Sequence, residues 1–173
     1  MEAVIILLLL ASFLTVWILS VRRGLEAQEI NIHNAMTQIR VHLQAEQEAL
    51  LSLLELLKNS IDPGMYREMR QQLAMSRDDK EELRPEKAAE QQKNLLQMQE
   101  KISGISEQMP LLQAQETYQK YWKAAKSYEN MVKTSGLIYN DSVERFNRML
   151  SKMPDRLAAG ICGFHPKKCM EII

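Results

Sequence analysis

The chain begins with a long apolar run that predicts a membrane-spanning helix. Residues 3–21 are AVIILLLLASFLTVWILSV and carry no charge. A helix rising about 1.5 Å per residue would span roughly 28 Å over this run, enough to cross the hydrocarbon core of a bilayer. A cleaved signal peptide is the rival interpretation, but Glu2 stands where such a peptide carries basic residues. We therefore predict a transmembrane anchor over residues 1–23.

The charges on the two sides of this run predict its orientation. Arg22 and Arg23 follow the run directly, whereas only Glu2 and the chain terminus precede it. Because positively charged flanks tend to remain in the cytoplasm, we expect the N-terminus outside and the rest of the chain inside. Trp17 lies about one turn before the arginine pair, where its ring either anchors at the headgroup level or simply faces lipid.

Four amphipathic helices are predicted in residues 24–153. The apolar positions of the first helix follow at steps of three, four and seven, which places them on one face. They are Ile32, Met36, Ile39, Leu43, Leu50, Leu54, Leu57 and Ile61. Proline and glycine mark the ends of the helices, and the expected bounds are 24–59, 65–83, 85–109 and 111–152. Short turns between them imply an antiparallel four-helix bundle with long first and last helices.

Two positions in the bundle leave alternatives open. Gly136 lies inside the last predicted helix, where it indicates either close packing against a neighbour or a kink. Residues 80–90 are densely charged, so they fit a solvated helix end or a disordered linker.

The tail, residues 154–173, differs in character from the helices before it. Gly160, Gly163 and Pro166 interrupt any helix there. Its apolar side chains still need burial, and we expect the tail to fold back on the bundle to provide it. These side chains are Leu157, Ile161 and Phe164.

Composition and charge narrow the class of protein. Only 6 Gly and 5 Pro occur among many strong helix formers, which favours an all-α fold. Lys plus Arg equals Asp plus Glu at 22 each, with both signs mixed along the chain. That balance lacks the basic footprint of a nucleic-acid binder, so we expect no nucleic-acid partner.

The search for catalytic chemistry finds no enzyme motif, and we predict neither an enzyme nor a cofactor. The sequence has no Gly-rich phosphate loop, G-x-S-x-G, H-E-x-x-H or C-x-x-C. Cys162, His165 and Cys169 form one weak metal candidate, because three zinc-type ligands lie close in sequence but a fourth is missing. A small buried Cys162 and an unpartnered Cys169 are the simpler interpretation.

Carboxylates and aromatic residues receive structural interpretations. No Glu-x-x-His pair supports a di-iron site, so the helical carboxylates are interpreted as solvated or paired with Lys and Arg. They are Glu46, Glu48, Glu116, Glu129 and Glu144. Aromatic residues at helical spacing, such as Tyr118 and Trp122, are interpreted as core.

The C-terminal third resembles the LemA family. Residues 136–154 are GLIYNDSVERFNRMLSKMP, and LAAGICGFHPKK follows at 157–168. The matching positions are Tyr139, Asn140, Asp141, Val143, Phe146, Asn147, Pro154, Gly160, Gly163 and Phe164. The resemblance is strong after Met109 and looser before it, where the family's Tyr-Asn pair and paired arginines are altered or missing. It implies a bacterial protein of the cytoplasmic (inner) membrane with a short outer N-terminus, one transmembrane helix and a cytoplasmic helical bundle.

The resemblance implies no reaction, so function rests on two hypotheses. The first is a membrane-tethered interaction or scaffold protein that recruits itself, as a homo-oligomer, or another protein partner, with membrane lipid around its anchor. The second is a sensor that binds a small molecule in the bundle core near Tyr118, Trp122 and Tyr139. On the last helix, Asn140 and Asn147 lie seven residues apart on one flank, where they either fix the register of a neighbouring segment or bind a ligand.

Overall fold

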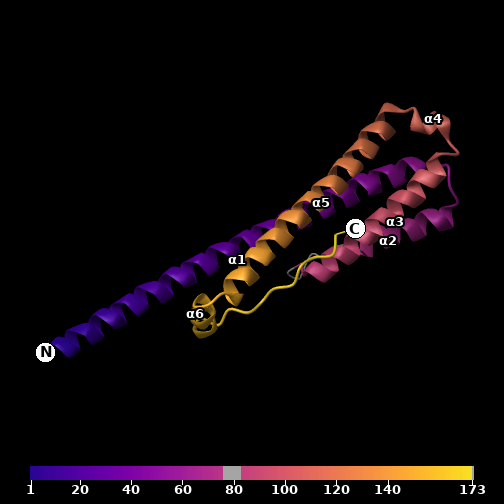
Figure 1. Ribbon diagram of the computed structural model, residues 1–173. Coiled ribbons are helices and arrows are strands. Elements are labelled where there is room, and N and C mark those ends of the chain that lie inside the picture. The colour runs from indigo at the N-terminus through magenta and orange to yellow at the C-terminus, as the bar shows by residue number, and fades with distance from the viewer. Residues whose placement is uncertain (76–82, 173) are drawn as a thin grey trace. The chain divides into compact units, whose positions relative to one another are not determined.

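A computed structural model of the chain describes residues 1–75 and 83–172, and all regular structure in these ranges is helical (Figure 1). The expected all-α class is confirmed. The helices are α1 (Glu2–Leu57), α2 (Pro63–Met75), α3 (Pro85–Ser106), α4 (Pro110–Gln113), α5 (Glu116–Ser151) and α6 (Asp155–Ile161).

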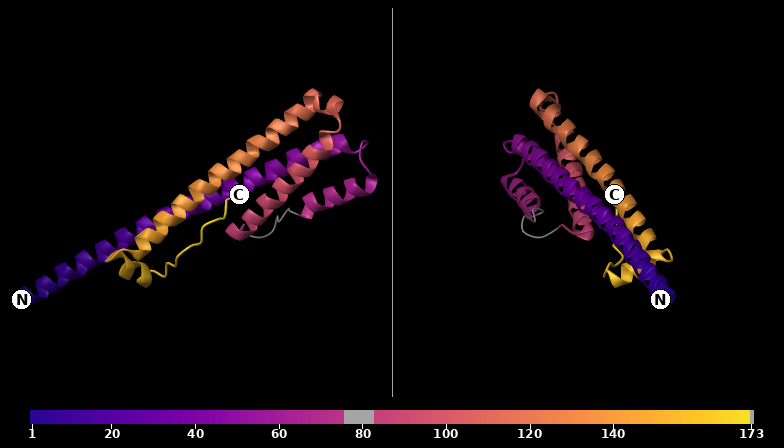
Figure 2. Two further views of the ribbon diagram at one scale, coloured as in Figure 1. Left: turned by 45° about the vertical axis from the view of Figure 1, so that its right-hand side comes forward. Right: turned by 90° about the vertical axis from the view of Figure 1, so that its left-hand side faces the viewer.

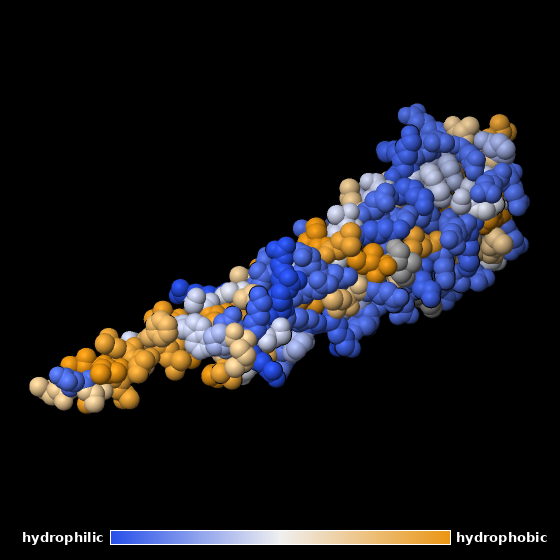
Figure 3. All heavy atoms as spheres, in the orientation of Figure 1, coloured by the Kyte–Doolittle hydropathy of each residue, from blue (hydrophilic) through white to orange (hydrophobic). Residues whose placement is uncertain are grey.

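Helix α1 joins the apolar run to the amphipathic segment without a break. Gly24 does not interrupt the helix, and the buried residues of α1 begin directly after it with Leu25, which is fully buried. An 18-residue window near the N-terminus is only 6% buried, and Figure 3 shows hydrophobic residues covering this part of the helix. Its length and composition are sufficient to cross a membrane. A signal sequence near the N-terminus would meet the same two criteria.

Helix α2 begins earlier than the sequence pattern predicted. Asp62 ends the preceding turn and caps α2, since its Oδ2 accepts hydrogen bonds from the N–H groups of Gly64 at 2.8 Å and Met65 at 3.1 Å. Pro63 then takes the first helical position, where a missing N–H costs nothing. The helix is described as far as Met75, so its predicted continuation to residue 83 falls largely outside the described residues.

Helix α3 begins at Pro85 as predicted, with Arg84 before it in an extended conformation. Of the charged segment 80–90, residues 80–82 lie outside the described residues, and 85–90 form the first turns of α3.

The last predicted helix is divided in two. Residues 110–113 form the short α4, residues 114–115 form a turn, and α5 starts at Glu116. The side-chain amide of Gln119 donates a hydrogen bond to the Gln113 carbonyl oxygen at 2.9 Å, which satisfies one of the carbonyls left open where α4 ends. The prediction of one continuous helix from residue 111 was therefore wrong at its first turn.

The chain forms two compact units. Unit 1 comprises Met1–Asn34 and Tyr139–Cys169, and unit 2 comprises Ala35–Ile138 and Met170–Ile173. In unit 2 the chain reverses direction between successive long helical segments, as all views of Figures 1 and 2 agree. Helix α2 packs against α3, and α3 against α4. The fully buried apolar side chains of unit 2 include Ile39, Leu43, Leu50, Leu53, Leu57, Leu95, Ile102, Ala125 and Val132.

Unit 1 has a smaller core, formed by parts of α1, α5, α6 and the segment after it. Its fully buried apolar side chains are Leu25, Val143, Phe146 and Ala158. Burial of a leucine or phenylalanine side chain stabilises a fold by roughly 1.5–3 kcal/mol. Leu25 and Phe146 therefore contribute strongly to the stability of this small core.

The tail buries different residues from those expected. Leu157 and Ile161 are 58% and 74% exposed, whereas Ala158 and Ala159 are buried. The tail forms the short helix α6, whose alanine side packs inward because small side chains permit close approach. Leu157 and Ile161, four residues apart, share the outward face, so the expectation that they would be buried was wrong.

Candidate functional site

The residues of the C-terminal motif hold the tail against α5 within unit 1. The side-chain amide of Asn147 donates to the Lys167 carbonyl oxygen at 2.8 Å and accepts from the Lys167 N–H at 2.9 Å. Eight residues earlier on α5, the Tyr139 hydroxyl donates to the Lys168 carbonyl oxygen at 3.0 Å. Two side chains of one helix thus satisfy backbone groups of an extended segment that has no helix or sheet to do so. We call these contacts the tail clasp.

Aromatic and charged contacts surround the tail clasp. Phe146 is fully buried and meets Phe164 edge to face, with ring centroids 6.2 Å apart. The Lys167 ammonium lies 5.5 Å from the Phe146 ring centroid and also pairs with the Glu29 carboxylate of α1. Lys167 therefore joins the tail to two helices of unit 1, to α5 through its backbone at Asn147 and to α1 through its side chain at Glu29.

The remaining motif residues shape the helix ends around this clasp. Val143 is fully buried, and exposed Asp141 pairs with Arg145 at 2.9 Å. Gly163 has φ +78°, a left-handed conformation that favours glycine at the residue after a helix, and Phe164 N–H donates to the Ala159 carbonyl oxygen across it at 3.1 Å. Asn140 is half-buried, and Pro154 and Gly160 are exposed. The motif thus has a clear structural role, and the geometry of Asn147 favours register fixing over ligand binding.

A second candidate region is a set of buried polar side chains inside unit 2, which with Glu129 of α5 we call the polar layer. Glu46 of α1 and Gln92 of α3 are fully buried, and Gln99 of α3 is 3% exposed. Within the described residues, neither carboxyl oxygen of Glu46 has a hydrogen-bond partner, and the side-chain amide of Gln92 has none. Buried polar groups without partners are rare and costly, so this polar layer needs an explanation.

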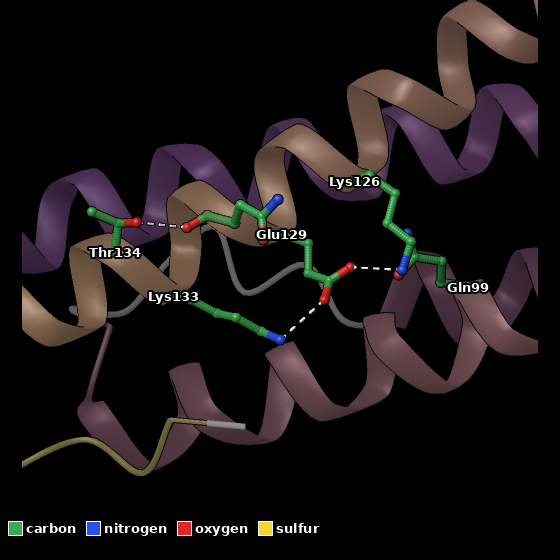
Figure 4. Close-up of polar contacts among 6 residues, drawn as sticks. Gln99, Lys126, Glu129, Lys133 and Thr134 are labelled. Atoms are coloured by element: carbon green, nitrogen blue, oxygen red, sulfur yellow. Dashed lines mark hydrogen bonds and ion pairs between the residues drawn. The ribbon is translucent and has the colours of Figure 1, made fainter.

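Glu129 of α5 belongs to the same layer, but its negative charge is paired with two lysines. Its carboxylate is paired with Lys126 at 3.0 Å and with Lys133 at 3.1 Å, and Lys126 also donates to the Gln99 side-chain oxygen at 3.3 Å (Figure 4). Both lysines reach the carboxylate from the exposed side of the helix, so their ammonium groups stay hydrated.

The two carboxyl groups of the layer have pKa values shifted in opposite directions. Burial, and then the nearby charge of Glu129, raises the pKa of Glu46 to about 8, although Lys126 and Lys133 oppose the shift. Burial also raises the pKa of Glu129, but the hydrogen bonds from Lys126 and Lys133 outweigh it and the net shift is downward. Glu46 is therefore protonated and neutral at pH 7, while Glu129 is ionised.

Sequence reasoning missed this layer, because it interpreted Glu46 and Glu129 as solvated or as paired with Lys and Arg. For Glu46 that interpretation was wrong, since its side chain is fully buried. Glu129 is only 8% exposed, but it pairs with Lys133 at i,i+4, which was the other expected arrangement. The signal was present as a gap of seven between Leu43 and Leu50 in the apolar stripe, which leaves one core position to residue 46 or 47. Gln47 is buried too, and its amide donates to the Leu73 carbonyl oxygen.

The aromatic residues proposed for a ligand cleft are packed as core or at its edge. Tyr118 is buried, stacks on Trp122 with ring centroids 6.1 Å apart, and its hydroxyl lies 2.7 Å from the Ser106 hydroxyl. Two surface grooves of about 540 and 620 Å³ lie along α2 and α3. None of Tyr118, Trp122 and Tyr139 lines either groove.

The weak metal candidate and the anchor residues lie apart from these contacts. Cys162 is a half-buried free cysteine and Cys169 an exposed one, and His165 is exposed. In the described parts of the chain, no three His, Cys, Asp or Glu side chains gather closely enough to hold a metal ion. Near the apolar run, Trp17 is half-buried, Arg23 is exposed and Arg22 pairs with Glu26 at 2.7 Å.

Comparison with known proteins agrees with the resemblance of the C-terminal motif. No curated protein matches the chain. A family model described as the LemA family matches residues 23–172, which begins at the second arginine after the apolar run and includes the polar layer and the tail clasp. Because the match covers nearly all of the sequence, the chain belongs to the LemA family.

Proposed function

We propose that the protein is a membrane-tethered scaffold that recruits itself or another protein and has no catalytic activity. The observation that carries the proposal is the exposed apolar start of α1, which continues as the same helix into a packed helical region. Water does not stabilise such a surface, whereas a bilayer does. The arginines after the run favour an outer N-terminus and a cytoplasmic helical region, in the inner membrane of a bacterium.

The arrangement of unit 2 supports an antiparallel four-helix bundle as the recruiting part. Its long helical segments alternate in direction and bury apolar stripes from α1, α3 and α5. In such a bundle the buried polar side chains of Glu46, Gln92 and Gln99 lower the stability but disfavour shifted registers, because a shift would place each of these groups against purely apolar neighbours.

Helix α5 presents the surface that we propose for self-association. Met131, Leu137 and Ile138 are 43%, 63% and 50% exposed within two turns of the helix. Met131 and Ile138 are seven residues apart and share a face. Confinement to a membrane raises the local concentration of the protein, so a modest apolar patch is enough for self-association there.

Crosslinking in native membranes tests this proposal. Met131→Cys is made in a chain carrying Cys162→Ser and Cys169→Ser, and Lys93→Cys on the exposed side of α3 is the matched control. A short thiol-reactive crosslinker is expected to give dimers, or adducts with another protein, from residue 131 and not from residue 93. Monomer alone at both positions would contradict the scaffold proposal.

A small-molecule sensor takes second place, because no described observation favours a cavity among the aromatic residues of the core. The grooves along α2 and α3 are open surface features. A ligand bound in the core would require Tyr118 to leave its buried position against Ser106.

A further inference from the structure

Helix α6 carries an apolar face that the protein itself does not cover. Leu157 and Ile161 are four residues apart on this face and are 58% and 74% exposed. Met153, just before the helix, is 65% exposed. Three large apolar side chains exposed so close together mark a contact surface, since single exposed apolar residues are ordinary but clusters are not.

The packing of unit 1 places this face at the level where the apolar run of α1 ends. A Cβ atom on Gly24 would lie 3.1 Å from the Met149 Cε atom, so this part of α5 packs directly against α1 at Gly24. The two helices run in opposite directions in every view of Figures 1 and 2. Continuing from Met149 toward α6 therefore moves back along α1 toward Val21, about 1.5 Å per residue.

Basic residues border the apolar face. The segment 148–168 contains only one carboxylate, at Asp155. Its cationic side chains are Arg148, Lys152, Arg156, Lys167 and Lys168. Lys152 and Arg156, the two that flank Met153, are exposed. An apolar face with a basic border is the combination that binds the surface of a bilayer containing anionic phospholipids.

We propose that α6 lies in the interface of the bilayer that α1 crosses, with Leu157 and Ile161 among the upper acyl chains and Lys152 and Arg156 at anionic phosphate groups. This inference rests on the proposed membrane anchor. A lipid surface is the occupant that the geometry favours, because the face lies at the end of the lipid-facing run and carries the charge that such a surface attracts. The tail clasp then fixes the segment after α6 to α5, so unit 1 is held at the membrane by two elements.

The test uses the full chain, reconstituted in vesicles of phosphatidylglycerol and phosphatidylcholine. The environment-sensitive fluorophore NBD is attached to single cysteines in a chain carrying Cys162→Ser and Cys169→Ser. Leu157→Cys and Ile161→Cys report on α6, Leu10→Cys reports on the anchor, and Lys123→Cys on the exposed side of α5 is the aqueous control. Circular dichroism checks that each variant remains helical, and lipids with a spin label near the headgroup serve as quenchers.

We expect the NBD emission at residues 157 and 161 to be blue-shifted. The quenching lipids should remove most of the fluorescence at these two positions and leave the fluorescence at residue 123 unchanged. Charge reversal by Lys152→Glu and Arg156→Glu should reduce that quenching. If NBD at residues 157 and 161 reports water while NBD at residue 10 reports lipid, this inference is overturned and the proposed anchor is kept. A blue shift without quenching would assign the face to a protein partner instead. A water-exposed probe at residue 10 would refute the anchor and the inference together.

Discussion

The Asn147 side chain pairs with the backbone of Lys167 through two hydrogen bonds, one in each direction. An amide can do this because it carries a donor and an acceptor on one planar group. The pairing explains why the last part of the chain follows α5 without forming regular structure of its own, and it gives Asn147 a role that aspartate cannot fill.

Asn147→Asp is expected to weaken the tail clasp. The carboxylate retains an acceptor for the Lys167 N–H but faces the Lys167 carbonyl oxygen without a proton to donate, so we expect a loss of about 1–3 kcal/mol. Amide hydrogen exchange at Lys167 and urea unfolding in detergent measure the effect. Asn130→Asp, at an exposed position on the same helix, is the control. Equal stability of the two variants would contradict the clasp.

Because the pKa of Glu46 is raised, we expect the protein to lose stability as pH rises. Its pKa is about 8 in the folded protein and near the ordinary value of 4.5 in the unfolded chain, so between these values only the folded state holds the proton. The unfolding free energy should fall by up to about 1.4 kcal/mol per pH unit across that window and level off above it. The paired Glu129 acts oppositely, and only at acidic pH, because its pKa is lowered.

Glu46→Gln should remove this slope and make the protein more stable than the wild type at pH 8. Urea unfolding at pH 6, 7 and 8 provides the measurement. Glu48→Gln, at an exposed position on the same helix, should leave the slope unchanged. A Glu46→Gln variant with the wild-type pH dependence would show that Glu46 is ionised and solvated.

Two glycines on helices predict different responses to alanine. A Cβ on Gly104 would meet nothing within 4 Å, so Gly104→Ala should stabilise by about 0.5–1 kcal/mol through helix propensity. A Cβ on Gly136 would lie 3.2 Å from the Ile172 Cγ1 atom, so Gly136→Ala should gain less. When Ile172→Ala is already present, Gly136→Ala should stabilise by as much as Gly104→Ala does. A thermal unfolding cycle tests this, and equal gains at both glycines would contradict the close packing at Gly136.

The sequence predicted the helical class well because proline positions and apolar periodicity act locally. Pro85 starts α3, and the apolar run lies in one exposed helix. Gly136 left a kink or close packing open, and α5 runs through it unbroken with Ile172 against it.

The parts that could not be predicted depend on contacts between distant residues. The burial of Glu46 depends on which face of α1 meets α3 and α5, and a single carboxylate gives no local sign of that. Leu157 and Ile161 were predicted to be buried because large apolar side chains usually are. In unit 1 the buried positions of this helix are instead Ala158 and Ala159.

The Cys-His-Cys segment predicts a clear result for metal content. Because no three ligand side chains come together in the described residues, protein purified without a histidine tag should contain far less than one zinc per chain. Treatment with a chelator should leave its thermal unfolding unchanged. One bound zinc per chain, lost together with stability in Cys162→Ser, would contradict this expectation.

We propose that α1 crosses a membrane and holds the helical region in the cytoplasm. Single cysteines are placed by Glu2→Cys and Ser127→Cys, both at exposed positions, in a chain carrying Cys162→Ser and Cys169→Ser, and intact cells are treated with a membrane-impermeant thiol reagent. We expect labelling at residue 2 in intact cells and at residue 127 only after the cells are opened. Labelling at residue 127 in intact cells would contradict it, because the helical region would then lie outside the membrane.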